Sequence, residues 1–204
     1  NYETCDARET DHTSDLIASA KLLRECDGIS TIIYGCTSGE LTFGRDLITH
    51  TIKAVFPDGT VVTPVQAAID AASSSSIRSL YILTPYDTGL NQRMAAMFEA
   101  ANIAVSGIYS PPFWTGLDLA LIDENELISV VKTVDLVDSE GLFVPCNAIP
   151  AVQAIAALER SLALPALTST QVCLWKALRL LDEADQISAE RFGSIFLGNH
   201  RPQQ

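Results

Sequence analysis

The chain has 204 residues, with 13 lysines and arginines against 25 aspartates and glutamates, so its formal net charge is −12. This length allows one large domain or two small ones, and an apolar fraction of 48% excludes a disordered chain. An isoelectric point near 4.5 argues against a nucleic-acid-binding protein, and the apolar runs are too short for a membrane-spanning helix.

The first part of the chain alternates helical and extended patterns. In chain order we expect a helix over 13–25, a strand over 30–34, a helix over 43–56, a strand over 60–63 and a helix over 64–72. The first helix has apolar residues at helical spacing behind a threonine or serine cap, and the last begins with proline. Both strands are short runs rich in β-branched residues.

The same alternation continues through the second part of the chain. Strands are expected at 79–84, 103–108, 141–145 and 166–168, and the helices that follow them at 87–101, 123–133, 149–161 and 170–181. Short buried strands that alternate with helices predict parallel sheets built from βαβ units. Ligands of such sheets bind beyond the carboxyl ends of the strands.

The five cysteines stand at wide and irregular spacings: Cys5, Cys26, Cys36, Cys146 and Cys173. An odd count without a CxxC pair is not the pattern of a secreted disulfide framework, and the three histidines lie far from the cysteines in the sequence. We therefore expect a reduced, cytoplasmic protein without a metal site, in which most cysteines are buried as small apolar residues.

Two of these cysteines occupy equivalent positions, each directly after a predicted strand. The run STIIYG leads to Cys36, and the run GLFVP leads to Cys146. A helix is expected directly after Cys146, and the positive end of a helix dipole lowers the pKa of a thiol. Free backbone N–H groups at such a turn form a cradle for an anion.

Polar donors follow both cysteines, namely the hydroxyls of Thr37 and Ser38 and the amide of Asn147. Two such turns that face each other would hold a carboxylate, with one sulfur on each face of its α-carbon. One thiolate then adds to this carbon or removes its proton, and the other thiol delivers a proton. No metal or organic cofactor is needed, because the N–H groups stabilise the enolate-like charge. The alternative is two cysteines that only pack at strand ends.

Four segments of the chain, in their order, carry a family resemblance. They are YGCTSG at 34–39, LTPY at 83–86, PCN at 145–147 and PALTSTQVCLW at 165–175. The first three resemble the first cysteine motif, the Thr-Pro-Tyr strand end and the second cysteine of the maleate cis-trans isomerase branch of the aspartate/glutamate racemase superfamily. The fourth resembles the Pro-Val-x-x-Ser-Asn-Gln-x-x-Leu-Trp segment of this branch, which also includes arylmalonate decarboxylases.

The resemblance implies an α/β fold of two pseudo-symmetric lobes, with mainly parallel sheets flanked by helices and the active site between the lobes. We assign residues 1–75 to the first lobe, completed by about 172–204, and residues 76–171 to the second. The resemblance also implies cofactor-free chemistry on a small carboxylate or dicarboxylate, in a homodimer or a higher homo-oligomer.

Roles follow from the resemblance position by position. Cys36 is expected to be the nucleophile or base on one face of the substrate, and Cys146 the acid or base on the other. Tyr86 is expected to donate a hydrogen bond to a substrate carboxylate. The other expected donors to carboxylate oxygens are Thr37, Ser38, Asn147, Ala148 and Thr170.

The chain departs from the branch at three places. Thr170 stands where the branch has asparagine, so a hydroxyl replaces an amide donor. An asparagine that the branch carries before its second cysteine has no clear counterpart, and Asp118 or Thr115 stands nearby. The branch opens with a strand and an asparagine-bearing loop, which are expected to precede Asn1.

The leading hypothesis is a cofactor-independent isomerase or racemase of a small carboxylate or dicarboxylate. One alternative is a decarboxylase or lyase of a substituted malonate with Cys146 as proton donor, although arylmalonate decarboxylases keep only the second cysteine. Another is a ligand-binding homologue with little or no turnover. Outside the motifs, we expect Glu40 to be a solvated acid and Cys173 to lie in the core. Trp114 is expected to be either a lid or an anchor in an interface or in the core.

Overall fold

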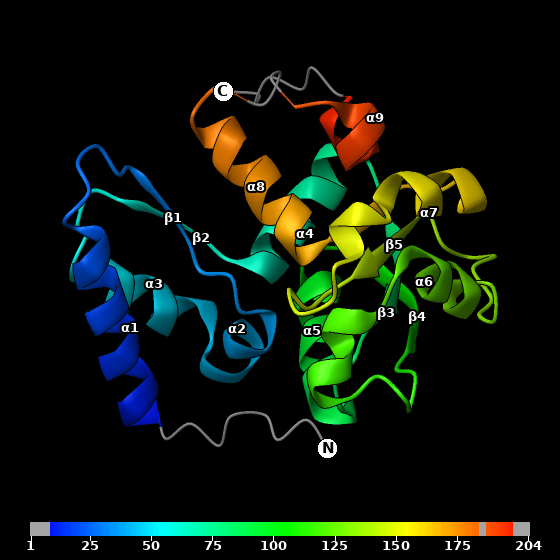
Figure 1. Ribbon diagram of the computed structural model, residues 1–204, viewed down its shortest axis with the longest axis horizontal. Helices are drawn as coiled ribbons and strands as arrows, with labels where there is room; N and C mark the ends of the chain where they lie inside the picture. Colours follow the sequence, from blue (N-terminus) through cyan, green and yellow to red (C-terminus); the bar gives the residue numbers. More distant parts are fainter. Residues whose placement is uncertain (1–8, 184–186, 198–204) are drawn as a thin grey trace.

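Two parallel sheets organise the chain in the computed structural model, which describes residues 9–183 and 187–197 (Figure 1). The smaller sheet pairs β1 (Thr31–Ile33) with β2 (Thr60–Val62). The larger sheet has the order β4-β3-β5-β6, with bounds Ala104–Tyr109, Ser79–Leu83, Gly141–Val144 and Ala166–Thr168. Every strand pair in this described part is parallel, as the βαβ pattern predicts.

Helices flank both sheets. In chain order they are α1 (Glu9–Leu23), α2 (Thr37–Phe43), α3 (Arg45–Lys53), α4 (Pro64–Ser74), α5 (Thr88–Ala100), α6 (Glu124–Val131), α7 (Ile155–Leu162), α8 (Ser169–Leu180) and α9 (Ala189–Phe192). Helix α8 packs against α4 and contacts β6 of the larger sheet as well as β1 and β2 of the smaller one. Figure 1 shows α1 and α3 beside the smaller sheet. The predicted α/β class with parallel sheets flanked by helices is confirmed.

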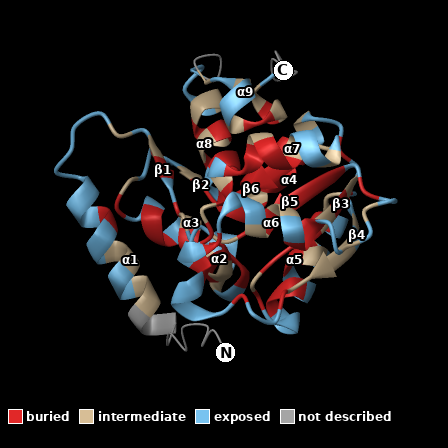
Figure 2. Ribbon diagram, turned by 45° about the vertical axis from the view of Figure 1, so that its right-hand side comes forward, coloured by how far each residue is buried: buried red, intermediate tan, exposed pale blue. Residues whose placement is uncertain are grey.

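The largest apolar core lies where α4 and α8 meet the larger sheet. Fully buried residues of this core come from α4, from β3 and from α5, among them Val65, Ile82 and Phe98. Phe98 meets Phe143 of β5 edge to face, with 5.6 Å between ring centroids. The buried colour in Figure 2 accordingly concentrates on α4 and β5, whereas α1 is largely exposed. This core includes Tyr86 and contacts Cys146, whereas Ile32 and Tyr34, which precede Cys36, belong to a smaller cluster with α3.

The helix predictions fail at three points near the site. The helix expected over 43–56 exists as α3 but is shorter, at Arg45–Lys53, because Gly44 with φ +82° separates it from α2. Helix α2, which begins directly after Cys36, was not predicted. The helix expected over 149–161 begins only at Ile155, after a 3₁₀ turn over Ala151–Gln153.

The division into lobes near residue 75 stays a prediction, since α8 contacts strands of both sheets. Residues 198–204, at the end of the range assigned to the first lobe, lie outside the described residues, as does Cys5. In the part of the chain that is described, none of the helices has both the length and the apolar character needed to cross a membrane.

Candidate active site

The predicted site residues follow the carboxyl ends of parallel strands. Cys36 comes after β1, Tyr86 after β3 and Cys146 after β5, and Ser169 directly follows β6 as the first residue of α8. Hydrogen bonds join these turns across long stretches of sequence, because parallel crossovers return each strand in the same direction. Through Ser169, these hydrogen bonds connect the turn after β1 with the turn after β5, as a site shared by the two cysteines requires.

Cys36 is held at the beginning of α2 and is exposed to solvent. Its backbone is extended, and its sulfur accepts a hydrogen bond of 3.3 Å from the N–H of Gly39, in the manner of a helix cap. The hydroxyl of Ser38 lies 3.5 Å from the same sulfur. The thiol is therefore fixed in direction and open to a small molecule.

Cys146 has an unusual backbone conformation. Its φ of +87° lies in the left-handed region, which costs a residue with a β-carbon about 1–3 kcal/mol. Its N–H donates to the hydroxyl oxygen of Ser169 at 3.3 Å, and its carbonyl accepts from Ile149 at 3.2 Å. No α-helix follows directly, so the helix-dipole argument made from the sequence does not apply to Cys146.

The pKa of the Cys146 thiol is raised above its usual value, mainly because the side chain is partly buried. Hydrogen bonds from the N–H of Ala148, the hydroxyl of Tyr86 and the N–H of Ile149 oppose this effect, and a negative charge on Cys36 adds to it. The lowered pKa expected from the sequence is therefore wrong for this cysteine. Cys146 keeps its proton at neutral pH, and a negative charge on Cys36 would repel the Cys146 thiolate.

Tyr86 is buried between the two cysteine turns. Burial raises the pKa of its hydroxyl well above the usual value, and the neighbouring Cys146 adds to this shift while Thr37 opposes it, so that the hydroxyl stays a protonated donor. Its backbone is fixed as well: its N–H donates to Thr84 at 3.1 Å, and its carbonyl accepts from Asn91 at 3.1 Å. The ring is therefore rigidly placed.

Asn147 and Thr170 form a more exposed layer above these groups. The side-chain amide of Asn147 donates to the carbonyl of Gly35, and its oxygen accepts a hydrogen bond of 3.0 Å from the hydroxyl of Thr170. Ala148 is exposed beside them. The turns that carry Cys36 and Cys146 are thus bridged by Asn147, and the hydroxyl that replaces the family asparagine contacts this bridge.

Sequence reasoning missed Ser169. Its side chain is 1% exposed, and its oxygen lies 2.8 Å from the hydroxyl oxygen of Thr37 and 3.3 Å from the nitrogen of Cys146. The signal was present, because Ser169 follows a predicted strand just as the two cysteines do. The comparison with the family drew attention to its neighbour Thr170 instead.

Glu40 is not the solvated acid expected from the sequence but is buried, with 1% of its surface exposed. Its carboxylate accepts hydrogen bonds from the hydroxyl of Thr63 (2.6 Å), from the N–H of Val65 (2.6 Å) and from the N–H of Gln66 (3.3 Å). Thr63 precedes α4 but does not cap it with its own side chain. Glu40 satisfies these N–H groups instead, and thereby ties α2 to α4.

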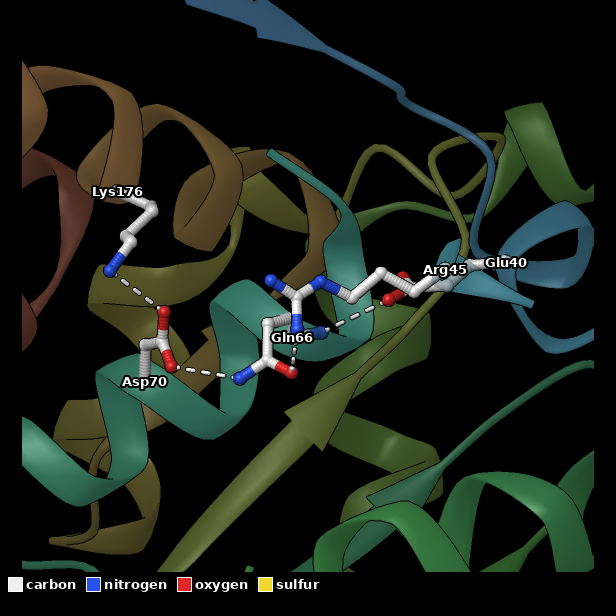
Figure 3. A network of polar contacts seen from close by, with 5 residues as sticks. All are labelled: Glu40, Arg45, Gln66, Asp70 and Lys176. Atoms are coloured by element: carbon white, nitrogen blue, oxygen red, sulfur yellow. Dashed lines mark hydrogen bonds and ion pairs between the residues drawn. The ribbon is translucent and has the colours of Figure 1, made fainter. Parts of the chain in front are cut away.

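Burial raises the pKa of Glu40, and its three hydrogen bonds and the charge of Arg45 oppose this shift in part. Figure 3 shows Arg45 near this carboxylate, and its guanidinium donates a hydrogen bond of 3.2 Å to the side-chain oxygen of Gln66. Gln66 in turn donates to Asp70 at 2.9 Å, and Asp70 pairs with Lys176 of α8 at 2.8 Å. These contacts link α3, α4 and α8 beside the buried acid.

The exposure of three further residues shows where each lies relative to the core. Cys173 lies in the core as expected, and burial together with the charge of Glu40 raises its pKa to about 12. Trp114 is a core anchor rather than a lid, since it is 3% exposed and its indole N–H donates to Glu126 at 2.9 Å. Asp118 is exposed on a 3₁₀ turn.

No group of three or more histidine, cysteine, aspartate or glutamate side chains is arranged to hold a metal ion within residues 9–183 and 187–197.

Comparison with known proteins places the chain in a family. The family model for arylmalonate decarboxylase matches residues 14–195. The arylmalonate decarboxylase of Bordetella bronchiseptica is 26% identical over 117 residues, which are 56% of this chain and 48% of that protein. The matched region thus spans about half the length of this curated relative.

Solved structures of two kinds of enzyme share the fold. A glycine-to-cysteine mutant of arylmalonate decarboxylase with associated sulfate superimposes with a TM-score of 0.80 at 21% identity, covering 96% of this chain and 85% of that one. The maleate cis-trans isomerase of Nocardia farcinica, bound to TRIS, gives 0.79 at 16% identity, covering 93% and 78%. A cysteine-to-serine mutant of the same isomerase carries a covalently bound succinylcysteine intermediate, with a TM-score of 0.76 at 14% identity and a coverage of 88% and 76%. These findings confirm the resemblance carried by the four segments, and the chain belongs to the arylmalonate decarboxylase family.

Proposed function

We propose that the protein is a cofactor-independent isomerase or racemase of a small carboxylate or dicarboxylate, with Cys36 and Cys146 acting on opposite faces of the substrate. The observation that carries this proposal is the shared environment of the two thiols. A charge on Cys36 raises the pKa of Cys146, and Tyr86 contacts both Cys146 and Thr37, the neighbour of Cys36. The succinylcysteine intermediate of the Nocardia farcinica isomerase supports covalent chemistry at a cysteine in this fold.

The two thiols differ in a way that assigns their roles. Cys36 is exposed, so its thiolate is the attacking group on an incoming substrate. Cys146 is partly buried and keeps its proton, so it is the acid that first donates and later removes a proton. Its contact with Tyr86 stabilises the thiolate that forms when the proton has left.

An unsaturated dicarboxylate of the maleate type illustrates the balance of the reaction. The Cys36 thiolate forms a C–S bond with one alkene carbon, while the π electron pair moves to the other carbon and takes the proton of Cys146. The resulting single bond rotates. The Cys146 thiolate then removes a proton from that carbon, the double bond forms again, and the C–S bond breaks. Both thiols return to their starting states, and no electrons are gained or lost.

Carboxylate recognition is proposed for the donors around the two sulfurs. Ser38, Ala148 and Thr170 supply groups that are at least partly exposed. The bridging amide of Asn147 lies with them, whereas Thr37 and Tyr86 lie in the buried layer below. The proposal includes a homodimer or higher homo-oligomer in the cytoplasm, which sedimentation and fractionation would test.

A decarboxylase is the second candidate, favoured by the proton that Cys146 retains and by the family match. Loss of carbon dioxide from a substituted malonate leaves an electron pair on the α-carbon and the remaining carboxylate. Cys146 would protonate this carbon and then recover its proton from solvent. In this reaction Cys36 has no covalent role.

The test is a substrate panel followed by proton NMR in deuterated water. Maleate, several amino acids and substituted malonates are each incubated with the protein. Geometric isomerisation, or exchange of the α-proton with racemisation, supports the leading proposal, and release of carbon dioxide supports the decarboxylase. Protection of Cys36 from iodoacetamide by a carboxylate that is not converted would instead indicate a ligand-binding homologue. The absence of both turnover and protection would contradict all three.

A further inference from the structure

The side chain of Asn147 reaches from one cysteine turn to the other. Asn147 directly follows Cys146 in the chain. Its amide nitrogen donates a hydrogen bond to the carbonyl of Gly35, which directly precedes Cys36. The hydroxyl of Thr170 donates to the amide oxygen of Asn147 at 3.0 Å. The amide is therefore held at both ends, by the turn after β1 and by the beginning of α8.

The orientation of this amide follows from the chemistry of its two partners. A backbone carbonyl only accepts hydrogen bonds, so the nitrogen of Asn147, and not its oxygen, has to face Gly35. The amide oxygen then faces Thr170, whose hydroxyl supplies the proton. In the reversed orientation two oxygen atoms without a shared proton would face each other. Both contacts therefore require the same orientation.

Gly35 leaves the space that the side chain of Asn147 needs. A β-carbon at residue 35 would lie 3.0 Å from the amide nitrogen of Asn147, which is closer than an ordinary van der Waals contact. The backbone of Gly35 does not have a positive φ. The restriction at this position therefore concerns space and not backbone conformation.

The amide nitrogen of Asn147 carries a second N–H group. Within residues 9–183 and 187–197 the side chain makes only the two hydrogen bonds described above, so this second N–H remains available. Asn147 and Thr170 are both exposed, so a small molecule can reach the amide. Because the nitrogen contacts the residue before Cys36, the available N–H lies at the turn that carries the exposed thiol.

We propose that Thr170 is a positioning residue, which holds the Asn147 amide so that its available N–H binds a carboxylate of the molecule that reacts at Cys36. This inference rests on the proposed function and deepens it, because Thr170 then acts on the carboxylate through Asn147. Without the Thr170 hydroxyl, the amide is held only at Gly35 and can turn about its last side-chain bond. A hydrogen bond to a charged acceptor is strong only when its donor is well directed.

The test compares iodoacetate with iodoacetamide, two alkylating reagents of nearly the same shape, of which only the first carries a carboxylate. Peptide mass spectrometry on the whole chain gives the rate of each reagent at Cys36, and the exposed Cys26 is an internal reference for the charge of the protein. In Thr170→Val, the ratio of the iodoacetate rate to the iodoacetamide rate at Cys36 should fall about threefold to tenfold, as expected for the loss of one hydrogen bond. Thr170→Ser keeps the hydroxyl and should keep the wild-type ratio. Where a substrate is turned over, KM should rise in Thr170→Val while kcat changes little.

Further variants approach the same amide from its other side. In Gly35→Ala the added β-carbon displaces the Asn147 nitrogen while Thr170 stays intact, so the ratio should fall even where Thr170→Val does not fold. In Asn147→Ala the ratio should be equally low, and adding Thr170→Val should change nothing further. The matched control is Thr133→Val, which removes an exposed threonine hydroxyl that donates to the carbonyl of Val130 at 2.7 Å.

A folded Thr170→Val protein with the wild-type ratio would overturn the proposal, and so would a Thr170→Ser protein with the ratio of the valine variant. An equal loss of both alkylation rates would also overturn it, because such a loss reports on the Cys36 thiol and not on the carboxylate. The ratio needs no turnover, so it is independent of the substrate panel. Turnover of a carboxylate together with an unchanged ratio would remove this inference and leave the proposed function standing.

Discussion

The carboxylate of Glu40 accepts a hydrogen bond of 2.6 Å from the N–H of Val65 at the beginning of α4. Glu40 lies one turn after Cys36 on α2, and its N–H donates to the carbonyl of Cys36 at 3.0 Å. The helix that carries one proposed catalytic thiol is therefore anchored to the core through a buried acid. Stability and site geometry are coupled at this point.

Replacing Glu40 by alanine should lower the free energy of unfolding by roughly 2–4 kcal/mol, because two backbone N–H groups and the Thr63 hydroxyl lose their buried acceptor. Urea denaturation followed by circular dichroism measures the loss. The matched control is Asp123→Ala, which removes an exposed cap from α6 and should cost about 1 kcal/mol. Equal losses in the two variants would contradict the buried role of Glu40.

The titration of Glu40 should make the free energy of unfolding depend on pH. Its pKa in the folded protein is raised above the usual 4.5, so between these two values the folded state holds a proton that the unfolded state has lost. The contribution of Glu40 to stability is thus greatest below pH 4.5, and it falls as the pH rises through the raised pKa.

Urea titrations of the wild type and of Glu40→Gln over this range measure the difference. The stability of the wild type relative to the variant should decrease with rising pH from about 4.5 upward and then become constant. A relative stability that is constant above about pH 4.5 and increases with pH below it would show instead that the carboxyl group has a lowered pKa in the folded protein.

The described cysteines should react with iodoacetamide in a fixed order at neutral pH. Cys36 and Cys26 are exposed and should be labelled first, and Cys146 should follow with a rate that increases with pH. Cys173, with a pKa raised to about 12, should be labelled only after unfolding. Peptide mass spectrometry resolves the sites, and labelling of native Cys173 as fast as Cys26 would contradict the burial assigned to it.

Gly39 should not tolerate a β-carbon. A methyl group there would overlap the hydroxyl of Tyr34 and lie 3.2 Å from the sulfur of Cys36. Gly39→Ala should therefore cost about 1–3 kcal/mol and change the alkylation rate of Cys36, because the first turn of α2 has to move. Gly89→Ala in α5 is the control and should cost less, since the added carbon meets only one side-chain oxygen, at 3.3 Å, and alanine favours the helix. Equal stability and Cys36 reactivity in the two variants would contradict the close fit.

The strands along the chain and the cysteine turns that follow two of them could be predicted, because both depend on local patterns of buried strands ending in small or polar residues. The burial of Glu40 could not, since it depends on α4 meeting α2 through residues more than twenty positions away. The direction of the pKa shift at Cys146 could not be predicted from the sequence either. It depends on burial and on a turn where a helix was expected.

Ser169 shows a different limit. Its position after β6 could be predicted, but its importance depends on Thr37, which is 132 residues away in the sequence and 2.8 Å away in the structure. A sequence motif indicates the family to which a chain belongs. The contacts that join two motifs appear only once the chain is folded.

The most direct test of the two-thiol mechanism is the turnover of Cys36→Ser and Cys146→Ser on the substrate that the wild type converts. Each substitution removes a thiol that acts on one face of the substrate, so each should lower kcat by about a hundredfold or more. Both proteins should retain the wild-type fold by circular dichroism. Wild-type turnover in Cys36→Ser together with loss in Cys146→Ser would point to the decarboxylase, and wild-type turnover in both variants would contradict the mechanism.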